Sequence, residues 1–314
     1  MKINNKLRQK FIKDFNLSIN VVNEPYFSYL IKLFGYEEQY DLFVKTISRF
    51  DNYESFRSFI DEILGYKKDG MIVKYVKSLD SYNDFINMDM NKYKIDNAFY
   101  KNELHIKNLY TNDKTNRKFI SIDLTTANFQ SLKYVGILKE DKFEEFLSRF
   151  TNDEYFYKTK ILRQIIFGKL CPKRQRTVIR YIMDIIFKQV KDICKNFDCE
   201  PIKYTEDEIL IDVTKLNNTL LLEKLINYNI DFDIHVKTFY IRSIDTDHGS
   251  FYYKQYFDNS RKIKSCDKRF YTEVFKLIHN MPIDLEYDLY AEEKINKEII
   301  RPFRYMGPIK LITN

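Results

Sequence analysis

Apolar residues recur at spacings of three and four over residues 1–95, in segments separated by Asn, Asp or Gly. This periodicity is typical of amphipathic helices that bury one face. The aromatic residues follow the same spacing, so we expect them to form the core of a small helical bundle. The pattern therefore predicts a helical N-terminal domain over residues 1–110. The polar stretch 111–118 marks its boundary.

Strand-like runs begin after this boundary. They cover residues 119–123, 201–204, 209–213 and 232–244. The link between the second and third runs is short enough for a hairpin, and helical patterns lie before and after that hairpin. The resulting order, β-α-β-β-α-β, is that of the ferredoxin-like or split βαβ unit. We therefore predict an α+β fold, with a ferredoxin-like domain over residues 111–248 and a basic, aromatic region over residues 249–314.

The composition excludes several classes of protein. No run of eighteen apolar residues occurs, so we expect no membrane-spanning helix and no membrane partner. The sequence lacks the GxGxxG, GxxxxGK[ST], GxSxG and HExxH patterns of common nucleotide-binding folds, hydrolases and metalloproteases. Its four cysteines form no CxxC pair, which argues against a zinc site or a disulfide framework. We therefore expect a protein of the reducing cytoplasm.

Acidic residues occur at two places that a ferredoxin-like sheet brings together. Asp123 closes the first predicted strand, and Glu206, Asp207 and Glu208 form the turn of the central hairpin. Converging carboxylates repel one another unless a cation compensates. Hard oxygen ligands suit Mg²⁺ or Mn²⁺, and phosphoryl transfer uses a pair of such ions. The alternative is a solvated acidic turn and an Asp123 that caps a helix.

Residues 158–180 contain eight Lys or Arg and no Asp or Glu, in a helical pattern broken by Pro172. Such a surface binds the phosphates of a nucleotide or of a nucleic-acid backbone. For nucleotide binding we select Lys160, Arg163 and Lys169. For nucleic-acid binding we select Lys173, Arg174 and Arg176. The alternative is a solvated helix face, although such a face normally carries both signs of charge.

A second basic segment, residues 251–271, carries Arg261, Lys262 and Lys264 among several tyrosines and phenylalanines. Aromatic rings among cations suit contact with a single strand or a primer–template. The alternative is a β-hairpin in which the aromatic residues pack against each other.

Three segments resemble motifs of palm-type, template-dependent polymerases. Residues 121–129 (SIDLTTANF) resemble motif A of reverse transcriptases and, more loosely, of family B DNA polymerases. Residues 204–208 (YTEDE) resemble motif C, and residues 160–170 (KILRQIIFGKL) resemble the family B motif B. The resemblance covers roughly residues 119–244 and implies a palm domain. It implies that Asp123, with Asp207 or Glu208, holds two metal ions, and that Asn128 and Phe129 lie beside the incoming nucleotide.

We therefore expect a nucleotidyltransferase, of viral or mobile-element type, that uses Mg²⁺ or Mn²⁺ to join nucleoside triphosphates to a 3′-hydroxyl. Its partners would be nucleic acid and other subunits of a polymerase complex, in the host cytoplasm if the protein is viral. One alternative is a catalytically inactive palm that serves as an accessory subunit of a replication or transcription complex. Another is a palm-fold cyclase that makes cyclic dinucleotides. An RNA-recognition domain is less favoured, because residues 119–123 and 209–213 offer only Phe119 for stacking.

Overall fold

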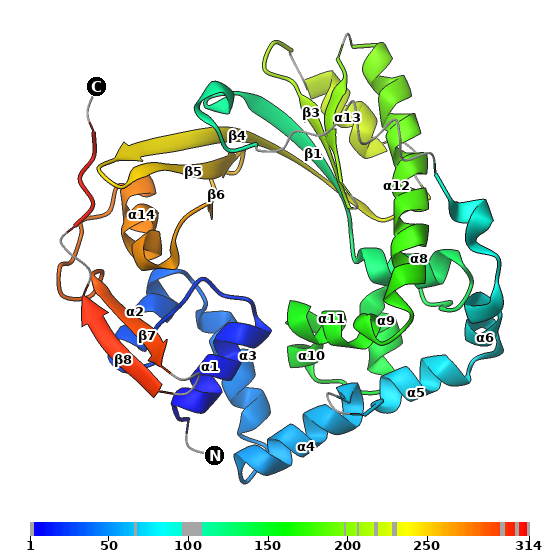
Figure 1. The fold of residues 1–314 in the computed structure, drawn as a ribbon, viewed down its shortest axis with the longest axis horizontal. Coiled ribbons are helices and arrows are strands. Elements are labelled where there is room, and N and C mark those ends of the chain that lie inside the picture. Colours follow the sequence, from blue (N-terminus) through cyan, green and yellow to red (C-terminus); the bar gives the residue numbers. More distant parts are fainter. Residues whose placement is uncertain are drawn as a thin grey trace.

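The fold combines a large set of helices with one main antiparallel sheet, as seen in a computed structural model. The structure describes residues 3–65, 68–95, 109–197, 199–205, 207–216, 219–227, 231–295, 299–304 and 308–312. The main sheet has six strands in the order β2-β3-β1-β4-β5-β6, and β7 and β8 form a separate two-stranded sheet. The elements are arranged around a ring (Figure 1), with the main sheet on one side and the N-terminal helices on the other.

Short amphipathic helices make up the N-terminal part of the chain. They are α1 (Asn5–Asp14), α2 (Tyr26–Leu33), α3 (Glu37–Ile47), α4 (Tyr53–Leu64), α5 (Met71–Ser78), α6 (Asp80–Asn87) and the 3₁₀ turn η1 (Met90–Tyr93). Helix α4 shows how the sequence defines their limits. Asn52 and Ser55 form a capping box at its start, and Gly65 follows its end with φ of 68°, a backbone conformation that glycine adopts without strain. The predicted N-terminal helices are confirmed.

The main sheet is built around β1 (Lys118–Leu124), which pairs antiparallel with β3 (Glu208–Asp212) and β4 (Ile234–Thr246). Strand β2 (Pro201–Tyr204) pairs with β3, while β5 (Gly249–Tyr256) and β6 (Arg261–Lys264) extend the sheet beyond β4. The prediction of an α+β fold is confirmed. The β5–β6 hairpin also agrees with the structural alternative considered for residues 251–271.

Helices connect the first strand to the central hairpin. They are α8 (Ala127–Tyr134), α9 (Phe143–Ser148), α10 (Glu154–Lys158), α11 (Lys160–Gly168) and α12 (Pro172–Lys195), and α13 (Thr219–Asn227) precedes β4. Proline at the first position of a helix leaves no hydrogen bond unmade, so Pro172 separates α11 from α12 by starting the second helix.

The two faces of the main sheet have different surroundings. Ile120, Ile122 and Leu124 of β1 enter the largest buried cluster, which also contains Leu7 of α1 and Leu225 of α13. The other side of the sheet carries Phe119, Ser121 and Asp123, because side chains alternate along a strand. We call this second side the acid-bearing face. The division into domains at residues 110 and 248 stays a prediction, and helices from both sides of residue 110 share one core.

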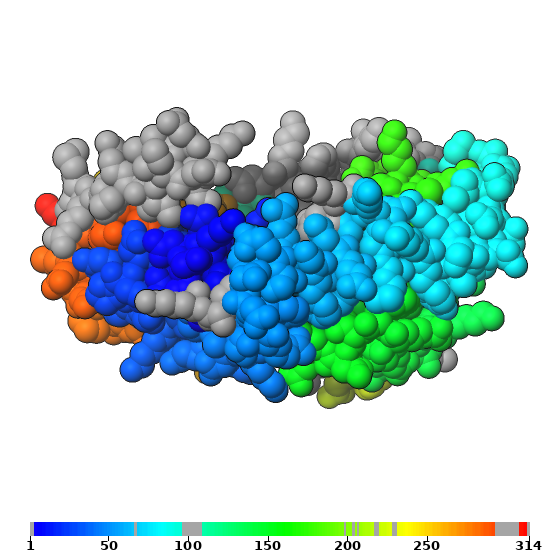
Figure 2. All heavy atoms as spheres, turned by 90° about the horizontal axis from the view of Figure 1, so that it is seen from below, coloured from blue at the N-terminus to red at the C-terminus, as the bar shows by residue number. Residues whose placement is uncertain are grey.

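The C-terminal segment packs against the N-terminal helices. It contains the 3₁₀ turn η3 (Lys268–Phe270), followed by α14 (Tyr271–Ile278), β7 (Tyr290–Ile295) and β8 (Ile299–Arg304). The Phe34 ring meets those of Tyr271 and Phe275 edge-on, and Tyr26 stacks on Tyr290 with ring centroids 3.6 Å apart. The side view shows this segment (orange) directly beside the N-terminal helices (blue) (Figure 2).

Candidate functional site

The end of β1 places Asp123 directly opposite Glu208 of β3. Residues directly opposite each other in an antiparallel pair point to the same face, with Cβ atoms about 5 Å apart. The two carboxylates therefore lie together on the acid-bearing face, as the sequence analysis expected of Asp123 and an acid of the hairpin. Strand β4 places His235 opposite Asp123 on the other side, so the same row crosses three strands.

The hydroxyl of Ser121 lies between the two carboxylates. It is 3.2 Å from Oδ2 of Asp123 and 2.9 Å from Oε1 of Glu208. The distance between these two carboxylate oxygens therefore cannot exceed the sum of the two distances. One hydroxyl has one proton and cannot neutralise two negative charges. A positively charged group close to the two carboxylates is therefore favourable.

A lysine from a more distant strand of the sheet supplies positive charge near Glu208. Nζ of Lys254 in β5 lies 3.5 Å from Oε1 of Glu208 and 3.9 Å from the centre of the Phe239 ring. The Lys254 side chain is nearly buried. Because β1 and β4 separate β3 from β5, this contact requires the twisted sheet to curve toward its acid-bearing face.

The pKa shifts describe the same concentration of charge. Burial and the neighbouring Glu208 raise the pKa of Asp123, while Ser121 and Lys254 act in the opposite direction. Burial and the charges of Lys262 and Lys254 lower the pKa of Lys264 to about 8, although Glu208 and Asp123 oppose this shift. Such shifts cluster at functional sites, and here they mark mixed acidic and basic groups on one half-buried face.

A pocket of about 320 Å³ lies at the same end of the sheet. Its lining includes Asp207 of the hairpin, Asn128 of α8, Gln164 and Gly168 of α11, and Arg176 of α12. The hairpin is tied to the end of β1, because the amide of Leu124 donates to the carbonyl oxygen of Asp207 at 3.0 Å. Residues from all three segments that resemble polymerase motifs therefore line one pocket.

Three predicted binding residues are engaged in contacts within the fold. Nζ of Lys169 donates to the carbonyl oxygens of Gly65 and Lys68. The guanidinium of Arg174 donates to the carbonyl oxygens of Phe85 and Met88, at 3.0 Å and 2.9 Å. Phe129 is buried against Phe143 and Phe146. These contacts hold helices together and give no support to a ligand-binding role for the three side chains.

The other predicted residues are spread over the surface around the site. Lys160 and Lys173 are exposed at the starts of α11 and α12, and Arg163 is half-buried above the Phe143 ring. Lys262 and Lys264 share the acid-bearing face with Lys254, since Lys254 pairs with Lys262 in the sheet, whereas Arg261 points to the opposite face. Glu206 lies outside the described residues.

The donor set at the sheet end suits Mg²⁺ in part. Within the described part of the chain, no three His, Cys, Asp or Glu side chains are grouped so that they could hold a metal ion. However, Mg²⁺ is commonly bound by one or two carboxylates together with water and the phosphates of a substrate. The Asp123–Glu208 pair supplies two such carboxylates. These residues could supply two of the oxygen ligands of a Mg²⁺ ion, and the remaining ligands would have to come from outside the protein.

Sequence reasoning assigned neither Ser121 nor Lys254 to this site, although Lys254 belongs to the basic segment 251–271. Ser121 could have been found from its position, two residues before Asp123 and thus on the same face. Lys254 gives no local signal of its role, because its contact with Glu208 depends on the curvature of the whole sheet.

Comparisons with known proteins do not assign the chain to a family. No protein-family model matches it, and no curated protein or solved structure is significantly similar to it. Every helix within the described ranges is too short or too polar to cross a lipid bilayer.

Proposed function

We propose that this protein is a palm-type nucleotidyltransferase that joins nucleoside triphosphates to the 3′-hydroxyl of a nucleic acid. The observation that carries the proposal is the Asp123–Glu208 pair. Two carboxylates lie together at the end of the central strands, and the hydroxyl of Ser121 bridges them. Chemistry on phosphates commonly uses such a pair to hold divalent cations.

The topology supports the same proposal. Strands β2, β3, β1 and β4 lie side by side and antiparallel, with helices between β1 and β2 and between β3 and β4. This order of elements is the one expected for the predicted βαββαβ unit, and it supports the proposal. Within a palm of this kind, the first strand and the central hairpin bring their acids to one edge, where Asp123, Asp207 and Glu208 lie.

Each residue would have a separate task. Asp123 and Glu208 would bind Mg²⁺ or Mn²⁺, which supplies positive charge to the reacting phosphates. Arg176 would contact the triphosphate from the pocket, and Asn128 would position the nucleotide. The Lys254 ammonium would hold Glu208 in place, because its own stem is fixed against the Phe239 ring.

A second candidate function follows from Lys254 itself. If its ammonium serves as the permanent counter-ion of Glu208, the pair has less need of a metal. The protein would then be an inactive palm that binds nucleic acid as an accessory subunit of a replication or transcription complex.

Nucleotide incorporation tests the two candidates. Purified protein is incubated with labelled nucleotides and Mg²⁺ or Mn²⁺, with and without a primed template. Asp123→Asn should abolish template-dependent extension, whereas Asp192→Asn, at an exposed residue of α12 that pairs with Lys195, should retain it. A product formed without template would indicate a cyclase. If the wild-type protein binds template but incorporates nothing, the accessory-subunit function is favoured.

A further inference from the structure

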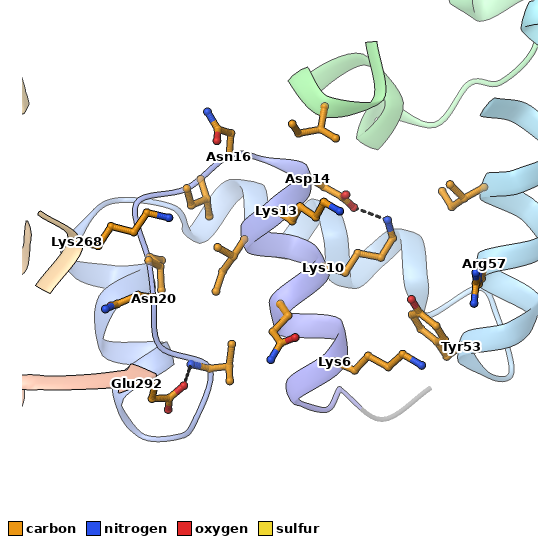
Figure 3. Close-up of a pocket in the computed structure, with 17 residues that line it drawn as sticks. Lys6, Lys10, Lys13, Asp14, Asn16, Asn20, Tyr53, Arg57, Lys268 and Glu292 are labelled. Carbon is orange, nitrogen blue, oxygen red and sulfur yellow. Dashed lines mark hydrogen bonds and ion pairs between the residues drawn. The ribbon is translucent and has the colours of Figure 1, made fainter. Parts of the chain in front are cut away.

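A second pocket lies away from the carboxylate pair, between the N-terminal helices and the C-terminal segment. It has a volume of about 940 Å³ and is lined by α1, by α4, by the start of α11, and by Lys268 and Glu292 from the C-terminal part (Figure 3). Neither of the polymerase-like segments that carry acids contributes to it.

The lining of this pocket is strongly basic. Its cationic side chains are Lys6, Lys10, Lys13, Arg57 and Lys268. Its acidic side chains are Asp14 and Glu292, and both are committed to contacts within the protein. Asp14 is buried, pairs with Lys10 at 2.7 Å and accepts from the hydroxyl of Tyr155. Glu292 accepts from the backbone amides of Val22 and Asn23.

The cations are arranged along a line. Lys6, Lys10 and Lys13 are four and three residues apart, so they share one face of α1 and extend over about 10 Å along its axis. Arg57 and Tyr53 lie on the α4 side of this row, and Lys268 lies on the opposite side (Figure 3). A row of this length exceeds a single phosphate and suits a chain of phosphates.

The pocket also offers groups that can contact bases. The Tyr53 ring is half-buried, with Nζ of Lys6 lying 4.2 Å from its centre. The amide side chains of Gln9, Asn16 and Asn20 also line the pocket, together with apolar residues such as Ile60 and Ile161. Proteins that bind single strands without sequence preference combine a basic groove with aromatic rings of this kind.

We propose that this pocket binds the backbone of a single-stranded nucleic acid. The proposal extends the proposed function by naming a surface that holds the strand. Helix α11 connects the two sites: Ile161 at its start lines the basic pocket, and Gln164 and Gly168 line the pocket that contains Asp207. Residues 161 and 168 are separated by about 10 Å along the helix. A strand held in the basic pocket thus lies within a few nucleotides of the carboxylate end of the sheet.

Binding of a fluorescein-labelled oligothymidylate of about twelve nucleotides, followed by anisotropy at several salt concentrations, tests the proposal. The key variant is Lys13→Ala with Lys268→Ala. Both side chains are exposed and form no ion pair among the described residues, so the fold should be retained, as thermal unfolding would verify. The matched control, Lys74→Ala with Lys224→Ala, removes two exposed lysines of α5 and α13 that likewise form no ion pair among the described residues.

The pocket variant should bind the oligonucleotide at least about tenfold more weakly than wild type, and its log–log salt slope should be smaller by about 1.4, since each lost phosphate contact contributes about 0.7. The control variant should bind like wild type. Wild-type binding should be the same with and without Mg²⁺ and nucleoside triphosphate, so a failure of the proposed catalysis would leave this test intact. A normal affinity in the pocket variant overturns the proposal. So does equally tight, pocket-dependent binding of tripolyphosphate or of polyglutamate, which would indicate a small-anion or acidic-peptide site.

Discussion

Lys254 and Glu208 form an ion pair across the acid-bearing face, with 3.5 Å between Nζ and Oε1, although two strands separate β5 from β3. The same Glu208 lies opposite Asp123. Under the proposed function, Lys254 and a divalent cation would compete for the same carboxylate, and the balance between them would decide between the two candidate functions.

Replacing Lys254 by Met keeps the apolar stem over Phe239 and removes the ammonium. We predict that Mg²⁺ binds this variant about tenfold more tightly, a gain of about 1.4 kcal/mol, because a competing cation is lost. The measurement is the Mg²⁺ dependence of the unfolding temperature. Lys45→Met, at an exposed residue of α3, is the control and should respond to Mg²⁺ as wild type does. Identical responses of the Lys254 variant and wild type would exclude a metal at Glu208.

The raised pKa of Asp123 has a consequence for stability. Burial and Glu208 make its ionised form less favourable in the folded state than in the unfolded state. Wild-type stability should therefore fall as pH rises from the ordinary carboxyl value through the raised value in the fold. The side chain in Asp123→Asn cannot ionise. This variant should therefore be more stable than wild type at pH 7 in the absence of metal. At a pH below the ordinary aspartate range this advantage should vanish. Urea unfolding at the two pH values measures the difference, and an advantage that is the same at both would contradict it.

Lys264 should make nucleic-acid binding depend on pH near neutrality. With a pKa lowered to about 8, its side chain is charged below that pH and neutral above it. We predict that oligonucleotide affinity decreases as pH rises from 7 to 9, and that Lys264→Arg reduces this decrease because arginine stays protonated. Anisotropy titrations across this range provide the measurement. An identical pH profile for the two proteins would show that Lys264 does not contact the strand.

Arg174 and Arg176 stand two residues apart but should respond differently to replacement by Ala. Arg174 donates to the carbonyl oxygens of Phe85 and Met88, so its loss should lower the free energy of unfolding by about 1–3 kcal/mol. Arg176 lines the pocket beside Asp207, so its loss should weaken nucleoside triphosphate binding by about tenfold or more. Urea unfolding and nucleotide binding, measured on both variants, test this contrast. Equal effects of the two changes on both quantities would contradict it.

Glu292 should hold the C-terminal segment against the N-terminal helices. Its carboxylate accepts from the amides of Val22 and Asn23 at 2.9 Å and 3.1 Å, and from the side chain of Asn23 at 2.6 Å. Glu292→Ala leaves buried donors without acceptors and should cost about 1–3 kcal/mol of unfolding free energy. Glu286→Ala, at an exposed position, should change stability little. Urea unfolding measures the free energy of unfolding of both variants. Equal stability of the two would show that the hydrogen bonds of Glu292 do not stabilise the fold.

The elements that the sequence predicts well are those with a strong local period. The described residues between 3 and 95 are mostly helical and β1 spans residues 118–124, close to the predicted limits, because their apolar spacing agrees with the way they are buried. The approach of Asp123 to Glu208 was predictable for a different reason. The order of elements places the first strand beside the central hairpin, and this leaves few possible neighbours for Asp123.

The roles of individual cations could not be predicted in this way. All charged residues of the basic segment 158–180 are Lys or Arg, and the sequence does not distinguish their roles. In the structure, Lys169 and Arg174 donate to backbone carbonyl oxygens, while Arg176 lines a pocket. Which of these occurs depends on loops from α4 and α6 that are far away in the chain. For the same reason the basic pocket was missed, since α1, α4 and the region of Lys268 meet only in the folded protein.

The bonds between Glu292 and the loop after α1 join residues 270 and 269 positions apart. During synthesis, the first helices therefore leave the ribosome long before the residue that completes their hydrogen bonds. Contacts that close loops of this length form late, because the entropy of bringing the ends together must be overcome first. The wall of the basic pocket that contains Lys268 and Glu292 is thus assembled last, and a nascent chain interrupted before that point would present α1 with its row of lysines uncovered.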